Sequence, residues 1–251
     1  MKKNNISDKK IEQERYDAFA MNNQDSFESM HYSNFPKFIQ TPYKFFHELI
    51  TESFNENSNV LEIGSGMGQY TKLLLDTGAK VTATDISQES INILKKRFER
   101  HFKGFSAGME DIERLSFDDS KFDFVISAGV LSYGDNSQVL KEIHRVLKDN
   151  GVFICVDSLN HNPIYRFNRY LHFLRKMRSK STLRNMPTIG LIKKYEQSFK
   201  KLDSYYFGKF IWLMPLAEKI IGEESSVTLS RFLDKFTPDF LAFKFVLIAR
   251  K

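Results

Sequence analysis

Three glycines stand at alternate positions in the segment VLEIGSGMGQY, residues 60–70. An apolar run precedes them, and a helical pattern, TKLLLDTG, follows them. This order indicates a β-strand that passes its chain into an α-helix through a tight loop. Because glycine has no Cβ atom, such a loop lets a ligand come close to the backbone. The segment therefore predicts a strand–loop–helix unit with a ligand at its turn.

Strand and helix patterns continue to alternate after this loop. The strand candidates lie at residues 59–64, 80–86, 104–108, 122–129, 151–157, 203–210 and 243–251. Helical patterns at 69–78, 87–102 and 137–151 lie between the early strands, and a further helical stretch separates the last two. Alternation of this kind predicts a doubly wound α/β fold, in which a mostly parallel sheet carries helices on both faces.

Positive charge is concentrated in one segment. Residues 160–201 contain eleven Lys and Arg and one acid, Glu196, which gives this window a net charge of +10. The whole chain carries +6, so the remainder carries −4. A basic segment rich in aromatic residues fits a solvated helix face, a contact with an anionic substrate, an RNA-binding surface or an interfacial helix at an anionic membrane.

We expect one large domain with two additions. Residues 1–45 form an N-terminal helical leader or lid, residues 46–251 form the α/β domain, and within it residues 159–203 form a basic helical insertion that caps the substrate site. The first residues lack the apolar core of a signal peptide, and the single cysteine, Cys155, excludes a disulfide framework. These features favour a cytoplasmic protein, and a peripheral place at the inner face of the membrane stays open.

An acidic residue, Asp85, ends the second strand candidate, 21 residues after Gly64. In open α/β sheets, ligands bind at the carboxyl ends of the strands, and an acid at this position accepts hydrogen bonds from ribose hydroxyls. A solvated helix cap is the alternative interpretation of Asp85. We predict a ligand that contains ribose.

The spacing of the glycines discriminates between ribose-containing ligands. A nicotinamide fingerprint requires G-x-G-x-x-G, but Gln69 occupies the position of its third glycine. Glu62, just ahead of the loop, would repel phosphates, and the G-K-[ST] sequence of a Walker loop is absent here. An acid beside the loop instead suits a ligand with a cationic group, such as the ammonium of an amino acid.

Five motifs together resemble those of class I S-adenosylmethionine-dependent methyltransferases. They are VLEIGSGMG, the acid Asp85, DIERLSF, FDFVISAGVLS and VLKDNGVFICVD, in that order. The resemblance covers residues 59–157, and the two late strands are similar to the antiparallel ending of that family. It implies a seven-stranded sheet with an antiparallel last strand, and S-adenosyl-L-methionine as the methyl donor.

The resemblance also implies which residues contact the cofactor. These are Glu62, Gly64, Ser65, Gly66, Gly68, Asp85, Ile86, Asp111, Ile112 and Ser127. Glu62 and Gly64 would lie against the methionine part, and Asp85 would hold the ribose hydroxyls.

Three further assignments follow from the same resemblance. Asp111, with the backbone of Ile112, would recognise the adenine edge, although the segment MEDIER also fits the exposed first turn of a helix. Ser127 would offer its backbone to the ammonium group. Gly68 would let the backbone approach the ligand, but it also fits a role in helix–strand packing alone.

The acceptor side offers fewer signals. His161 follows the fifth strand candidate, which places it at the cofactor edge of the sheet and makes it the candidate general base. It equally fits a histidine that hydrogen-bonds a loop backbone. The candidate substrate contacts are Tyr16, His31, Tyr133, Arg166 and Arg169. No metal site is predicted, and the Asn-Pro-Pro-Tyr signature of DNA amine methylation is absent from the sequence.

Together these features predict an S-adenosylmethionine-dependent methyltransferase. The expected acceptor is an anionic small molecule linked to a sugar or glycan, bound near His161 and the basic segment. An RNA methyltransferase and a non-catalytic, basic module at the membrane surface are the alternatives.

Overall fold

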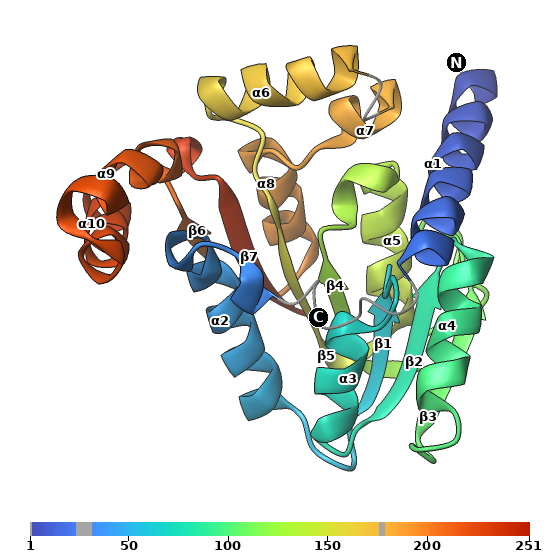
Figure 1. Ribbon diagram of the computed structural model, residues 1–251. Coiled ribbons are helices and arrows are strands. Elements are labelled where there is room, and N and C mark those ends of the chain that lie inside the picture. The colour runs from blue at the N-terminus through green and yellow to red at the C-terminus, as the bar shows by residue number, and fades with distance from the viewer. Residues whose placement is uncertain (1, 24–31, 176–178) are drawn as a thin grey trace.

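One sheet of seven strands organises the part of the chain that the computed structural model describes, residues 2–23, 32–175 and 179–251 (Figure 1). The strands are β1 (Asn59–Ile63), β2 (Lys80–Asp85), β3 (Phe105–Met109), β4 (Phe122–Ala128), β5 (Leu147–Ser158), β6 (Lys201–Phe207) and β7 (Lys244–Arg250). Their order across the sheet is β3-β2-β1-β4-β5-β7-β6. β7 runs antiparallel to both β5 and β6, and the other pairs are parallel. The predicted fold class, with its antiparallel last strand, is confirmed.

Alternate side chains of the central strands enter two apolar cores, one on each face of the sheet. In β1, Leu61 and Ile63 join one core, whereas Val60 joins the other. In β4, Val125 and Ile126 divide in the same way. This division follows from the two-residue period of a strand. Because both faces are covered, the central strands are apolar along most of their length.

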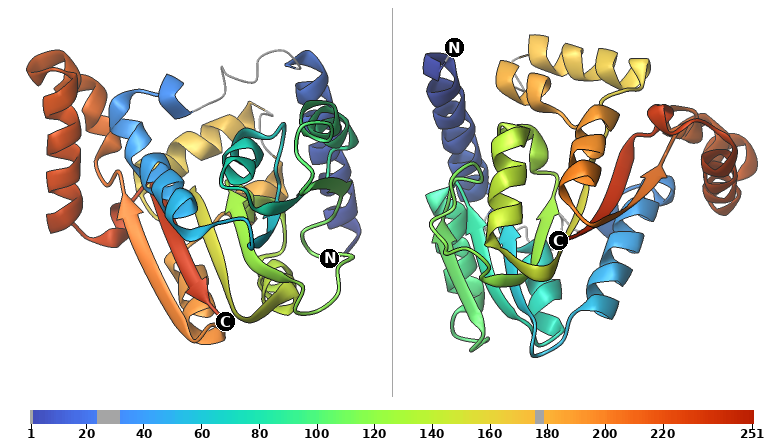
Figure 2. Two further views of the ribbon diagram at one scale, coloured as in Figure 1. Left: turned by 90° about the horizontal axis from the view of Figure 1, so that it is seen from below. Right: turned by 180° about the vertical axis from the view of Figure 1, so that it is seen from behind.

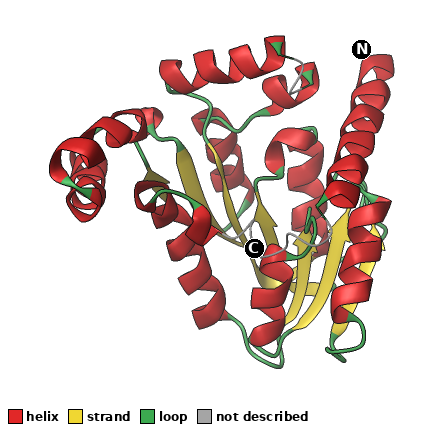
Figure 3. Cartoon of the chain, viewed as in Figure 1, coloured by secondary structure: helices red, strands yellow, loops and turns green. Residues whose placement is uncertain are grey.

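Helices cover both faces of the sheet (Figure 2, Figure 3). They are α1 (Lys2–Asn22), α2 (Lys37–Ser53), α3 (Gln69–Asp76), α4 (Gln88–Phe98), α5 (Asn136–Val146), α6 (Pro163–Leu174), α7 (Lys180–Asn185), α8 (Ile189–Ser198), α9 (Met214–Ile221) and α10 (Glu223–Phe236). On one face, α2, α3 and α4 contribute fully buried side chains such as Phe46, Leu74 and Leu94. On the other face, α5 and α8 contribute Ile143 and Tyr195.

Polar side chains begin several of these helices. At the start of α4, Ser87 Oγ accepts the backbone N–H of Ser90. Asp135 caps α5 in the same manner, and Asn162 caps α6 by accepting the N–H of Ile164. Each cap satisfies a backbone donor that the first helical turn leaves unpaired, which explains why the helices begin at these residues.

Three helices lie beyond the carboxyl ends of the parallel strands. They are α1, α6 and α7, at the top of Figure 1, and α7 contacts both α1 and the 3-10 turn η3 (Leu131–Tyr133). The predicted insertion, residues 159–203, thus places two of its helices at the edge where open α/β sheets bind ligands. Among the described residues, no helix is both long and apolar enough to cross a bilayer.

The predicted boundary between residues 45 and 46 falls inside α2. This helix is continuous, and Phe46 and Ile50 of α2 are fully buried against the sheet. The part of the predicted leader from Lys37 onward is therefore packed as a component of the α/β domain. At the opposite edge from β3, α9 and α10 project outward beside β6 (Figure 1).

Gly68 stands where the glycine loop enters α3. Its φ angle is +98°, and a Cβ atom at this position would lie 2.5 Å from Phe98 Cε2 and 2.8 Å from Leu94 Cδ2. Both neighbours are buried side chains of α4. Gly68 therefore lets the start of α3 approach α4, which is a helix–helix contact, whereas the sequence left open a role in helix–strand packing.

We expect Gly68→Ala to lower the free energy of unfolding by about 2–4 kcal/mol, because it combines left-handed backbone strain with overpacking against α4. Urea denaturation followed by circular dichroism measures the change. Gly108→Ala in β3 is the matched control, since nothing lies within 4 Å of its added Cβ atom. Equal transition midpoints for the two variants would contradict this account.

Candidate functional site

A cavity, which we name the loop cavity, lies at the carboxyl ends of β1, β2 and β4. The sequence-predicted residues that line it are Gly64, Ser65, Gly66, Asp85, Ile86, Asp111, Ile112, Tyr16 and Tyr133. They come from the glycine loop, the end of β2, the turn after β3, helix α1 and the turn η3. The fold thus brings together residues that are up to 117 positions apart in the chain.

Asp85 braces the glycine loop. Its Oδ2 accepts the backbone N–H of Gly66 at 2.8 Å, and its Oδ1 accepts the N–H of Ser87 at 2.9 Å. Burial raises the pKa of the Asp85 carboxyl, and these backbone hydrogen bonds oppose that shift in part. Gly66 has a φ of +53°, and no atom lies within 4 Å of the position that a Cβ would take. The loop backbone is therefore open to a ligand at this point.

Glu62 lies behind the loop rather than on the cavity wall. Its side chain is buried, and Thr71 Oγ1 of α3 donates a hydrogen bond to its Oε2 at 2.5 Å. Burial raises the pKa of the Glu62 carboxyl to about 8. In this position Glu62 joins β1 to α3, and its predicted contact with the methionine part of the cofactor stays a prediction.

Helix α1 closes the end of the loop cavity next to Asp111. Lys9 of α1 forms ion pairs with Asp111 at 2.6 Å and with Glu113 at 2.8 Å. Further along α1, Asp17 accepts a hydrogen bond from Ser87 Oγ at 2.5 Å. These contacts hold α1 across the cavity, and its role as a lid stays a prediction.

An aromatic pair stands where α1 meets η3. Tyr16 and Tyr133 make an edge-to-face contact with ring centroids 5.5 Å apart, and the guanidinium of Arg15 lies 5.0 Å from the Tyr16 centroid. Burial raises the pKa of Tyr16 well above its ordinary value, so the phenol stays neutral. Both tyrosines line the loop cavity, next to the predicted cofactor residues.

Several predicted residues lie elsewhere. Ser127 is fully buried within β4, so the cavity wall begins one residue later, at Ala128 and Gly129. Gly68 packs against α4, as described above. His31 lies outside the described residues. Arg166 is exposed on α6 and lines neither the loop cavity nor the chamber described below.

The geometry of Arg169 indicates a structural role. Its side chain is buried, and its guanidinium donates to the carbonyl of Leu159 at 2.7 Å and to Asn160 Oδ1 at 3.1 Å. It therefore fastens α6 to the end of β5.

His161 lies in the same connection, and its Nε2 is buried without a hydrogen-bond partner among the described residues. His161 lines neither cavity, and its role as a base stays a prediction.

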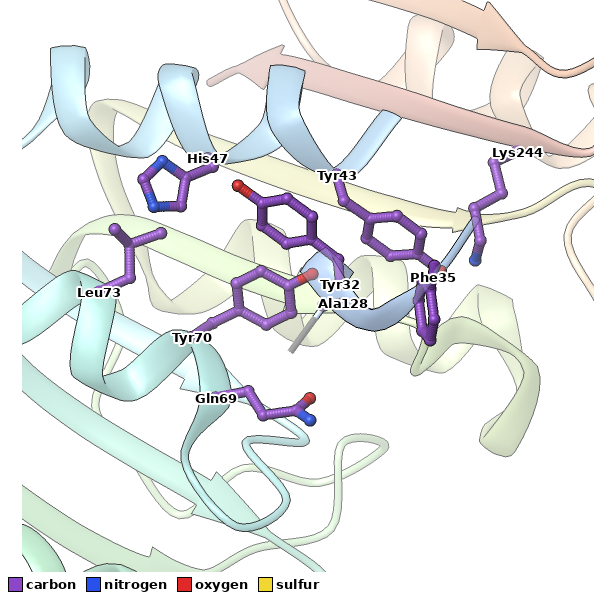
Figure 4. Close-up of a pocket in the computed structure, with 10 residues that line it drawn as sticks. Tyr32, Phe35, Tyr43, His47, Gln69, Tyr70, Leu73, Ala128 and Lys244 are labelled. Atoms are coloured by element: carbon purple, nitrogen blue, oxygen red, sulfur yellow. The ribbon is translucent and has the colours of Figure 1, made fainter. Parts of the chain in front are cut away.

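A second cavity adjoins the first, and the sequence analysis did not identify it (Figure 4). We name it the aromatic chamber. Its lining includes Tyr32, Phe35, Tyr43, His47, Tyr70 and Lys244. Four of these come from the segment 32–47, whose dense aromatic pattern, YSNFPKFIQTPYKFFH, was the available signal. Lys244 carried no local signal, because only the tertiary fold brings β7 next to α2.

The loop cavity and the aromatic chamber share part of their lining. Gln69 and Tyr70 at the start of α3, and Ala128 and Gly129 at the end of β4, belong to both. A molecule in the chamber therefore lies next to the end of the loop cavity that is formed by the glycine loop. This arrangement can bring two ligands into contact at the carboxyl end of β4.

Comparisons with known proteins agree with this geometry. Residues 61–155 match the family model described as a methyltransferase domain. The chain is 34% identical over 119 residues to the ubiquinone/menaquinone biosynthesis C-methyltransferase UbiE of Rickettsia bellii, a match that covers 44% of this chain and 48% of that protein. It is 29% identical over 201 residues to the sterol 4-C-methyltransferase strm-1 of Caenorhabditis elegans, covering 76% of this chain and 56% of that protein. The chain thus spans about half the length of the curated relatives it matches.

Solved structures share the fold at low identity. Phosphoethanolamine N-methyltransferase 2 of Haemonchus contortus, solved with S-adenosyl-L-methionine, aligns with a TM-score of 0.59 and 14% identity over 83% of this chain and 52% of that one. The [4+2]-cyclase SpnF aligns with a TM-score of 0.56 and 17% identity over 82% of this chain and 80% of that one. One architecture therefore serves different reactions, and the chemistry must be argued from the site.

Residues 61–155 match the model of a methyltransferase domain, and the motifs in this stretch resemble those of the class I, S-adenosylmethionine-dependent family. S-adenosyl-L-methionine is the methyl donor of this family, and the loop cavity fits it. Asp85 presents a carboxylate where a ribose would lie, and the open space over Gly66 admits a ligand against the backbone. Asp111 and Ile112 stand further along the same wall, where an adenine ring would follow the ribose.

The raised pKa of Glu62 predicts a pH dependence of stability. An unfolded Glu loses its proton above about pH 4.5, whereas the folded state keeps this proton up to about pH 8, so the folded protein binds more protons in between. This carboxyl therefore makes the protein less stable as pH rises across that window. Glu62→Gln should make the free energy of unfolding depend less on pH. The stability of the variant relative to the wild type should be highest at pH 8.

Urea denaturation at pH 5, 6.5 and 8 measures this effect. Glu52→Gln, on the exposed part of α2, is the matched control and should follow the wild type. Parallel curves for wild type and Glu62→Gln across the whole range would show that Glu62 does not titrate in this window.

Proposed function

We propose that this protein transfers the methyl group of S-adenosyl-L-methionine to a small-molecule acceptor held in the aromatic chamber. The observation that carries the proposal is the shared lining of the two cavities at Gln69, Tyr70, Ala128 and Gly129. Methyl transfer from a sulfonium is an in-line displacement, so the acceptor must lie directly against the methyl group. Two adjoining cavities provide that alignment.

The orientation of the donor follows from the acids along the loop cavity. With the ribose at Asp85 and the adenine near Asp111, the methionine part extends toward Gly64 and Gly129. Gly129 also lines the aromatic chamber, so this orientation points the sulfonium at the acceptor. The reverse orientation would place the methyl group beside α1, away from the chamber.

The proposed acceptor carries a negative charge. Lys244 lines the chamber and is 8% exposed, and no Asp or Glu belongs to the chamber lining that the structure describes. This ammonium takes the place that the sequence analysis gave to Arg166 and Arg169. The predicted link to a sugar or glycan stays a prediction, and no feature of the chamber favours RNA.

Asp85→Ala should weaken the binding of S-adenosylhomocysteine about tenfold or more, because a carboxylate hydrogen-bonded to a hydroxyl contributes about 1.5–3 kcal/mol. Isothermal titration calorimetry on the full chain measures the affinity. Asp76→Ala, which removes an exposed carboxylate paired with Lys72 on α3, is the matched control and should bind as the wild type does. Failure of the folded wild type to bind either form of the cofactor would refute the proposed function.

Helix α6 supports a further proposal about the partners of this protein. Ile164, Phe167, Tyr170 and Leu174 expose between 44% and 64% of their surface, and Arg166 on the same helix is exposed as well. No acidic residue occurs between residues 158 and 195. An apolar, basic helix of this kind fits the interface of an anionic bilayer. We propose that α6 touches such a surface.

The double variant Phe167→Ser, Leu174→Ser should bind vesicles about tenfold more weakly than the wild type, because two apolar side chains no longer enter the bilayer. Sedimentation with vesicles of phosphatidylcholine, with and without phosphatidylglycerol, measures the binding. Phe232→Ser, Phe236→Ser on α10 is the control, since it removes equally exposed side chains from another surface. Equal binding of both double variants, or no preference for the anionic lipid, would exclude this role of α6.

A further inference from the structure

The walls of the aromatic chamber are flat. The rings of Tyr32 and Tyr43 lie nearly parallel, with an interplanar angle of 6° and centroids 6.1 Å apart, and Phe35 meets Tyr43 edge-on at 5.5 Å. His47 approaches Tyr32 at 6.1 Å from the other side. Figure 4 shows these rings and Tyr70 around one space. Aromatic faces and edges contribute most to binding when the ligand is itself a planar ring.

One end of the chamber carries a buried ammonium group. Lys244 is the first residue of β7, its Nζ lies 5.0 Å from the Tyr43 centroid, and it donates to Ser158 Oγ at 3.3 Å. In Figure 4, Lys244 and His47 lie at opposite ends of the chamber. An ammonium in a largely apolar space favours an anion beside it, because water screens the charge poorly there.

The carboxylate of Asp157 does not take this place. Asp157, on the neighbouring strand β5, is buried and interacts with Lys244 through its charge. Its two oxygens already accept backbone N–H groups, from Leu131 at 2.9 Å and from Ser158 at 2.6 Å. Asp157 is also absent from the chamber lining. Burial raises the pKa of its carboxyl, which reduces its power to neutralise Lys244.

We infer that the aromatic chamber binds a phenol in its ionised form, with the ring against Tyr43 and the oxygen beside Lys244. A saturated carboxylate would satisfy the charge but make no use of the flat walls. A sugar can lay its C–H face on one ring, but its hydroxyls then point outward and need several polar partners to replace their hydrogen bonds to water. An acceptor that enters as a phenolate also needs no separate base to take its proton. Binding of the phenolate does not depend on the proposed function. Only the statement that the bound phenol accepts a methyl group rests on the proposed function.

The spectrum of 4-nitrophenol tests the inference directly, because its visible absorbance reports the phenolate. In the presence of excess wild-type protein, the pKa of the probe should fall by about 1–2 units, as an opposite charge within contact distance requires. Lys244→Gln should abolish this shift, and Lys244→Arg should retain it. Lys148→Gln, which removes a lysine paired with Asp123 far from the chamber, is the matched control.

Two further probes separate the ring from the charge. Cyclohexanecarboxylate, an anion without an aromatic face, should bind about three- to tenfold more weakly than 4-nitrophenolate. 4-Nitroanisole, which has the ring but cannot ionise, should bind equally to wild type and Lys244→Gln. Phe35→Ala should weaken 4-nitrophenolate binding without removing the pKa shift of the bound probe, which gives a readout if Lys244→Gln does not fold.

Calorimetry with S-adenosylhomocysteine on the same proteins separates this inference from the proposed function. If the wild type binds S-adenosylhomocysteine but leaves the pKa of 4-nitrophenol unchanged, the inference is wrong and the proposed function stands. A shift that persists in Lys244→Gln would overturn it equally. If the phenolate binds through Lys244 but S-adenosylhomocysteine does not bind, the proposed function fails and the assignment of the chamber survives.

Discussion

The hydrogen bond from the backbone N–H of Gly66 to the carboxylate of Asp85 organises the site. It joins the loop after β1 to the last residue of β2, and the parallel register that pairs Ile63 with Thr84 brings these two segments level. A buried carboxylate is costly unless donors surround it, and two backbone N–H groups provide that compensation. The same contact holds the glycine loop open above Gly66. The position of α3, and with it Tyr70, follows from where this loop ends.

The two cavities carry side chains of opposite charge, and this difference suits the proposed reaction. Asp85 stands at the loop, where the donor would bring a sulfonium and an ammonium, whereas Glu62 behind the loop keeps its proton up to about pH 8 and so contributes little charge. The ammonium of Lys244 stands in the chamber, where the proposed acceptor brings a negative oxygen. Under the proposed reaction, each ligand would meet the opposite charge in its own cavity, and the two ligands would attract each other across the shared wall. Methyl transfer would remove the positive charge of the sulfonium and the negative charge of the acceptor oxygen. Both products would therefore bind the site more weakly than the reactants.

The sequence predicts those features of the fold and of the site that depend on local residue patterns. Strand periodicity, the glycine loop and the acid at Asp85 all lie within one continuous stretch, so the loop cavity followed from order and spacing. The aromatic chamber did not, because Lys244 is 201 positions from Tyr43 and meets it only through the reversed strand β7. Arg169 shows the opposite case. Its place in a basic helix favoured the prediction of a substrate contact. In the structure, its buried guanidinium instead donates a hydrogen bond to the carbonyl of Leu159, just after β5.

Helix α1 and the sheet are held by different combinations of forces. The sheet is closed by apolar cores on both faces, whereas α1 is held by a small apolar cluster of Ala20 with Met67 and Ile93 and by polar contacts such as Lys9 with Asp111. The Lys9 and Asp111 side chains are partly exposed, and ion pairs of that kind contribute about 1 kcal/mol or less. Water can replace such contacts, but it cannot replace buried apolar ones without a large cost. The ion pair of Lys9 with Asp111 is therefore a weak contact at the loop cavity, whereas apolar cores on both faces of the sheet fix the strands that carry Asp85 and Gly129.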